Sequence, residues 1–176
     1  MRTALSIAGV AIFVLTAAGT ALAQGSGAEA RLKQLNITLP ADQAPTANFV
    51  NSVQAGKLLF LSGNTPGGQW PLKGKVGKDL TIEQGYDSAR QTGLIMLGKI
   101  RTALGSLDRV KRVVKVLGMV NSADGFSDQP KVVNGFSDLM VEVFGETVGK
   151  HARSAVGMAG LPGNAPIEVE MIVEVE

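Results

Sequence analysis

The C-terminal part of the sequence holds side chains that can bind a carboxylate and move a proton. Arg153 can grip a small carboxylate through two parallel hydrogen bonds, because a guanidinium presents its donors in a fixed fork. Glu168 can accept a proton from water, or direct that water onto an electrophilic carbon, if it borders a cleft. Two structural alternatives remain open: an ion pair of Arg153 with Glu168 or Glu170, and a Glu168 that is only solvated or salt-bridged at an interface.

Several kinds of chemistry are excluded by composition. The sequence has no cysteine, so thiol catalysis, disulfides and cysteine-ligated metals are ruled out. His151 is the one histidine, and it cannot by itself build a zinc cluster or the two-histidine arrangement of many ribonucleases. We therefore expect no metal and no cofactor, and we expect His151 to border the cleft or a subunit contact.

The N-terminus has the sequence pattern of an export signal. Met1-Arg2 precedes an apolar run over residues 4–18, and Ala21-Leu22-Ala23 provides a small-x-small cleavage site. The prediction is a signal peptide over residues 1–23 and a soluble periplasmic or secreted chain of roughly 150 residues, enough for one domain. An uncleaved membrane anchor is the alternative. Without Arg2 the chain is nearly neutral, so we expect neither nucleic acid nor, after cleavage, membrane as a partner.

The elements that must position these side chains follow from periodicity. Residues 24–46 form an N-terminal arm, expected to be peripheral, with a short helix over 29–35. Two strands over 48–53 and 57–62 form a hairpin, and residues 58–61 are apolar throughout, which favours a strand covered on both faces. The stretch 63–78 is a glycine-rich loop.

The second half of the chain alternates helices and strands. Thr81 precedes a helix that Gly105 ends, and a second helix begins at Pro130 and is closed by Gly145. The strands are expected over residues 110–120, 153–158 and 167–175. Within the last of these, Glu168 and Glu170 share one face.

This order predicts an α+β fold with a mixed sheet and two helices packed on one face. The other face is expected to carry apolar residues that nothing in the chain covers. An uncovered apolar face favours a homo-oligomer. The residues assigned to it are Val114, Val116, Val156 and Met171.

The C-terminal part contains three motifs: His151-Ala152-Arg153-Ser154-Ala155-Val156, Gly160-Leu161-Pro162 and Ile167-Glu168-Val169-Glu170-Met171. In letters and spacing they resemble the Ala-Arg-Ser, Leu-Pro and Ile-Glu-x-Glu signature of the RidA/YjgF family of trimeric enamine/imine deaminases. Ser62-Gly63 with Pro66, and Val133-Asn134, match further. The arm over 32–40 and the stretch over 120–126 are similar to the longer, chorismate-mutase-like branch of the family.

The resemblance implies that residues 47–176 form the family domain. It also implies a homotrimer with ligand clefts between its subunits. It implies that Arg153 binds the carboxylate of a 2-imino or enamine acid and that Glu168 helps to position water. Asn134 would line the neighbouring subunit's cleft, with a surface asparagine as the competing interpretation, while Ser62 and Gly63 would shape the cleft floor.

Two substrate-binding positions depart from the family pattern. Phe49 stands where a tyrosine is common, which removes a hydroxyl but keeps the ring. Ala155 replaces a common cysteine at a position that acts through its backbone.

The resemblance implies hydrolytic deamination of small reactive imines or enamines to 2-oxo acids and ammonia. The alternative is a non-catalytic protein that binds a small carboxylate-bearing metabolite. A ribonuclease or translation inhibitor, a label that some family members carry, is disfavoured by the near-neutral charge, the single histidine and the export signal.

Overall fold

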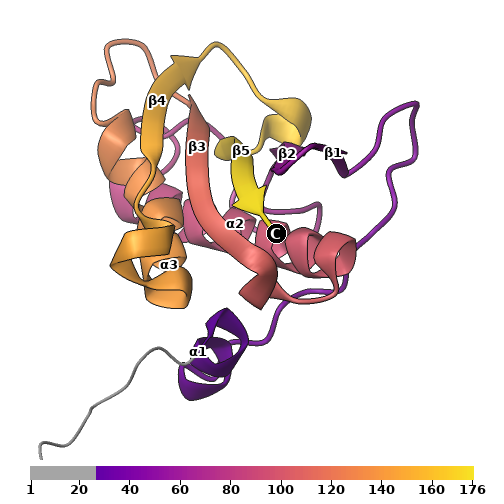
Figure 1. The fold of residues 1–176 in the computed structure, drawn as a ribbon. Coiled ribbons are helices and arrows are strands. Elements are labelled where there is room, and N and C mark those ends of the chain that lie inside the picture. The colour runs from indigo at the N-terminus through magenta and orange to yellow at the C-terminus, as the bar shows by residue number, and fades with distance from the viewer. Residues whose placement is uncertain (1–26) are drawn as a thin grey trace, which may run out of the picture.

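The computed structural model describes residues 27–176, and the predicted signal peptide lies outside them. One mixed sheet has the strand order β1-β2-β5-β3-β4, in which β3 and β4 are parallel and the other neighbours are antiparallel (Figure 1). The strands are β1 Ser52–Ala55, β2 Leu58–Asn64, β3 Val110–Asn121, β4 Ala152–Met158 and β5 Ile167–Val175. The helices are α1 Ala28–Gln34, α2 Ile82–Leu104 and α3 Gln129–Gly149. The α+β class and the mixed sheet are as expected from the sequence.

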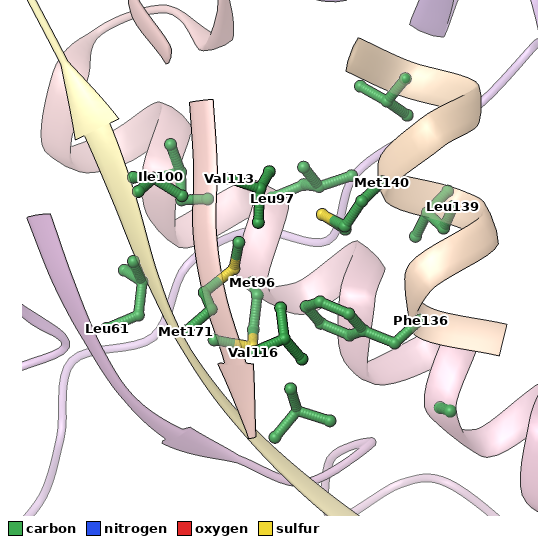
Figure 2. Packing of buried hydrophobic residues seen from close by; sticks show 14 of the residues in the cluster. Leu61, Met96, Leu97, Ile100, Val113, Val116, Phe136, Leu139, Met140 and Met171 are labelled. Atoms are coloured by element: carbon green, nitrogen blue, oxygen red, sulfur yellow. The ribbon is translucent and has the colours of Figure 1, made fainter. Parts of the chain in front are cut away.

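The hydrophobic core lies between the sheet and the two long helices (Figure 2). α2 and α3 cover the same face of the sheet, as predicted, and Phe136, Leu97 and Met96 are completely buried there. Val116 and Met171 also belong to this core, so their assignment to the open face was wrong. The two residues pair across β3 and β5, which puts both side chains on the helix side.

The ends of α2 are set by local chemistry. The Thr81 side chain accepts from the Gln84 backbone N–H while Gln84 reaches back to Thr81, which is a complete capping box. Gly105 ends the helix with φ 81°, a conformation that glycine adopts without strain. In α3, Gly145 has φ 77° but a further turn continues to Gly149. With ψ 169° as well, Gly145 is outside the helical conformation, so the first helical run ends there as predicted and a short second run completes α3.

The opposite face of the sheet is open in the described chain. Leu59 and Leu61 are buried under the helices, whereas Leu58 and Phe60 are exposed. The expectation that this strand is covered on both faces was wrong, since no element of residues 27–176 covers the second face. The large apolar side chains exposed there, which we call the open-face patch, are Val53, Leu58, Phe60, Val156 and Met158.

The N-terminal arm is anchored to the domain. Leu32 of α1 is 2% exposed and joins the core. Glu29 accepts two hydrogen bonds from Arg101, at 3.0 and 2.7 Å, and one from the Leu107 backbone N–H at 3.0 Å. Burial alone would raise the pKa of Glu29, but these donors lower it overall. Within residues 27–176, no helix has the length and apolar character needed to cross a membrane.

Candidate functional site

Arg153 lies on the edge strand β4 and is held by α3. It is in register with the fully buried Val116 of β3, so its side chain starts on the helix side of the sheet. Its Nη1 donates to Asn134 Oδ1 at 2.8 Å and to Ser137 Oγ at 3.1 Å. Asn134 and Ser137 are three residues apart on α3 and therefore share one side of that helix.

This arrangement leaves one edge of the guanidinium unused. Both Nη1 hydrogens have acceptors, but no group among residues 27–176 accepts from Nε or Nη2. The ion pair with Glu168 or Glu170 that the sequence left open does not form within the described chain. An edge with Nε–H and Nη2–H side by side matches the two oxygens of a carboxylate.

His151 completes this cluster, which we call the arginine cluster (Asn134, Ser137, His151 and Arg153). The Nε2 atom lies 3.1 Å from Ser137 Oγ, and Nδ1 lies 2.6 Å from the Gly149 carbonyl oxygen. Burial lowers the pKa of His151, as does the nearby positive charge of Arg153, against the opposing effect of the Gly149 carbonyl. His151 is thus partly buried and neutral at physiological pH.

A second cluster surrounds Glu168 at the end of β2. A cavity of about 750 Å³ opens there and contains Glu168, Gly63 and Phe49 among its lining residues. A Cβ atom at position 63 would overlap the Glu168 carboxylate, so glycine is what allows that carboxylate to lie against the strand. Burial and the neighbouring Glu170 raise the pKa of Glu168.

The far wall of the cavity contains a buried cation that the sequence analysis did not identify. Lys99 of α2 is 7% exposed, and its Nζ donates to Asp42 Oδ1 at 3.1 Å and to Asn51 Oδ1 at 2.7 Å. Asn51 in turn donates to Asp42 at 3.0 Å. The ion pair between Lys99 and Asp42 ties the N-terminal arm to α2, and its two charges balance. Among the residues that line the cavity, Glu168 is then the carboxylate without an ion-pair partner.

The remaining predicted site residues have different positions. Ala155 is in register with Gly118 and so shares the helix-side face with Arg153. Ser62 does not line the cavity; its hydroxyl donates to the Val50 carbonyl at 2.6 Å and fixes the segment before β1. Ser137 was missed, although its i+3 spacing from Asn134 is the signal that could have found it.

Arg153 and Glu168 are not brought together within one chain. Arg153 pairs with Val116 and Glu168 pairs with Met119, and these β3 residues are an odd number of positions apart. The two side chains therefore lie on opposite faces of the sheet. No group of three or more histidine, aspartate or glutamate side chains among residues 27–176 could hold a metal ion.

Comparison with known proteins gives a consistent match. Residues 29–175 match the family described as YjgF/chorismate mutase-like, whose label also carries the word endoribonuclease. The chain is 47% identical over 149 residues to protein TCP17 of Trypanosoma cruzi, covering 82% of this chain and 92% of that protein.

Two solved structures are similar along most of their length. Protein Atu1372 of Agrobacterium tumefaciens is 40% identical with a TM-score of 0.76, covering 84% of this chain and 91% of that one. A protein of Shewanella oneidensis labelled as an endoribonuclease is 30% identical with a TM-score of 0.80, covering 85% and 100%. These matches confirm the resemblance that the C-terminal motifs suggested.

Proposed function

The chain belongs to the YjgF/Rid family, and from this premise we propose that it hydrolyses small imines or enamines derived from amino acids. In the imine reaction, the oxygen of water bonds to the imine carbon and the carbon–nitrogen bond breaks. Nitrogen leaves as ammonia with the two hydrogens of water, and a 2-oxo acid remains. No cofactor is needed for this balance.

The observation that carries the proposal is the free edge of Arg153. Its Nη1 is fixed by Asn134 and Ser137, while Nε and Nη2 have no acceptor among residues 27–176. A half-buried guanidinium held in this way is preorganised to bind the carboxylate of an imino acid in a bidentate manner. The imine carbon, one bond away, is then fixed in place.

Glu168 is the proposed water-positioning group. It borders the cavity of about 750 Å³, and burial raises the pKa of its carboxyl, which suits a group that exchanges a proton with water. Because Arg153 and Glu168 lie on opposite faces of one sheet, a complete site requires a second copy of the chain. In the proposed homotrimer, the open-face patch is buried and one subunit's Glu168 faces its neighbour's Arg153.

A coupled assay tests the proposal. An amino-acid oxidase generates the imine in situ, and release of the 2-oxo acid is followed with the mature protein, with its Arg153→Ala variant and without either. We expect faster release only with the unsubstituted protein. Equal rates in all three reactions, together with binding of 2-oxobutanoate in a calorimetric titration, would establish the non-catalytic binding protein instead. The absence of a hydroxyl at Phe49 favours this alternative.

The family label suggests one more activity to measure. Incubation of the mature protein with single-stranded RNA and analysis of fragment length tests for endoribonuclease activity. We expect intact RNA, because the single histidine is engaged by Ser137 and the Gly149 carbonyl.

We also propose that the protein is exported and begins near Gln24 after cleavage. Intact-mass measurement of the protein from the periplasm or medium decides this. An unprocessed chain in the membrane fraction would contradict it.

A further inference from the structure

The hydroxyl of Ser137 is arranged unusually for a serine within a helix. Ser88 of α2 donates to the carbonyl oxygen four residues earlier, at 2.8 Å from Gln84, as helical serines often do. Ser137 makes no such bond. It lies instead between Arg153 Nη1 at 3.1 Å and His151 Nε2 at 3.1 Å.

The hydrogens along this chain can all be assigned. The Gly149 carbonyl can only accept, so the nearby Nδ1 of His151 carries the ring proton. In the neutral ring Nε2 is then an acceptor. Arg153 Nη1 can only donate, so it donates to Ser137 Oγ, and the serine's own hydrogen is left for His151 Nε2.

From this geometry we infer that Ser137 and His151 are positioning residues, a relay that holds the Arg153 guanidinium with its free edge toward the ligand. The inference rests on the proposed function for the identity of that ligand, a small 2-oxo or 2-imino carboxylate. The relay runs in one direction, from Arg153 through the Ser137 hydroxyl to the neutral His151 ring and on to the Gly149 carbonyl.

Protonation of His151 disrupts this relay. The imidazolium has donors at both nitrogens, so Nε2 no longer accepts from Ser137. Arg153 is the charged group that acts on His151, while α3 faces the ring with the uncharged Ser137 hydroxyl and Gly149 carbonyl. Two cations then share one hydroxyl, and Asn134 is the one undisturbed partner that still orients the guanidinium.

Calorimetric titration of the mature protein with 2-oxobutanoate at pH 7.5 and pH 5.5 tests the relay. We expect the affinity of the unsubstituted protein to be lower at pH 5.5 than at pH 7.5, by at most about tenfold, because the folded pKa of His151 lies below 6.5 and only part of the protein is protonated at pH 5.5. His151→Gln keeps an acceptor that does not titrate, so its affinity should be independent of pH. Ser137→Ala and His151→Phe should bind weakly at both pH values.

The control is Thr147→Ala, which removes an exposed hydroxyl from the last turn of α3 and should behave as the unsubstituted protein does. Affinity that rises on acidification, or a His151→Phe variant that binds normally, would overturn the relay. Thermal melts of each variant separate loss of folding from loss of orientation.

A second measurement is independent of ligand binding. Because the sequence contains one histidine, a long-range ¹H–¹⁵N NMR spectrum of the labelled protein reports a single imidazole. At neutral pH we expect the unsubstituted protein to have the His151 tautomer protonated at Nδ1. In Ser137→Ala we expect the other tautomer or a mixture of the two. A ring protonated at Nε2 in the unsubstituted protein would refute the relay. If no 2-oxo acid binds, the proposed function fails, and this spectrum still decides the relay.

Discussion

The carboxylate of Glu168 lies against Gly63, in the space that a Cβ atom at position 63 would occupy. Gly63→Ala should therefore displace the Glu168 side chain while the strand remains intact, because the group that must move is the end of a flexible side chain. We expect turnover of imines to fall at least tenfold with little change in 2-oxobutanoate affinity. Gly160→Ala, where a Cβ atom meets nothing, is the matched control.

Glu168→Gln tests the role of the carboxylate itself. The amide keeps the shape but cannot accept a proton, so turnover should fall by a factor of about 10² to 10⁴. Binding of 2-oxobutanoate should persist. In the unsubstituted protein, turnover should decline with acidification from a pH above 4.5, since burial and Glu170 raise the pKa of this group. A pH profile of the imine assay measures both effects, and unchanged turnover in Glu168→Gln would remove Glu168 from the mechanism.

Arg153→Ala should abolish 2-oxo acid binding and turnover. A hydrogen bond to a charged group contributes about 1.5 to 3 kcal/mol, and a bidentate pair is lost. Arg153→Lys should restore little, because an ammonium cannot reproduce the planar fork. Titration calorimetry measures both variants, and light scattering confirms that they keep the oligomeric state. Normal binding by Arg153→Ala would contradict the assignment of the carboxylate site.

Phe60→Glu tests the open-face patch. Phe60 is 41% exposed in the single chain, and a charge there cannot be buried between subunits without a large desolvation cost. We expect the mature protein to be a trimer by light scattering and Phe60→Glu to be a folded monomer without imine turnover. Thr102→Glu, at an exposed position of α2, should stay trimeric. A monomeric unsubstituted protein would contradict the composite site.

His151 should make the folded protein less stable in acid. Its folded pKa lies below the ordinary 6.5, so the unfolded chain binds more protons as pH falls through 6.5. The free energy of unfolding should therefore decrease from pH 7.5 to pH 5.5, and part of that decrease should vanish in His151→Gln. Urea unfolding at fixed protein concentration measures this difference. If the free energy of unfolding depends on pH equally in both proteins, protonation of His151 is not the cause of the decrease.

Local signals were sufficient to predict most of the elements. The pairing of Thr81 with Gln84, and the position of Gly105, set the ends of α2 through bonds within a few residues. Apolar periodicity likewise located α3 and β5, and the alternation of Glu168 with buried Val169 followed from strand geometry alone. Such features depend on neighbours in sequence, which is why no tertiary information was needed.

The faces of the sheet and the partners of the site depended on tertiary structure. Val116 and Met171 face the helices because β3 and β5 pair in one particular register, which neither strand encodes alone. Ser137 and His151 meet Arg153 only because α3 packs beside β4. The types of residue able to bind a carboxylate were evident from the sequence. Helix packing decided that the Arg153 guanidinium keeps a free edge, and strand register decided that Glu168 lies on the other side of the sheet.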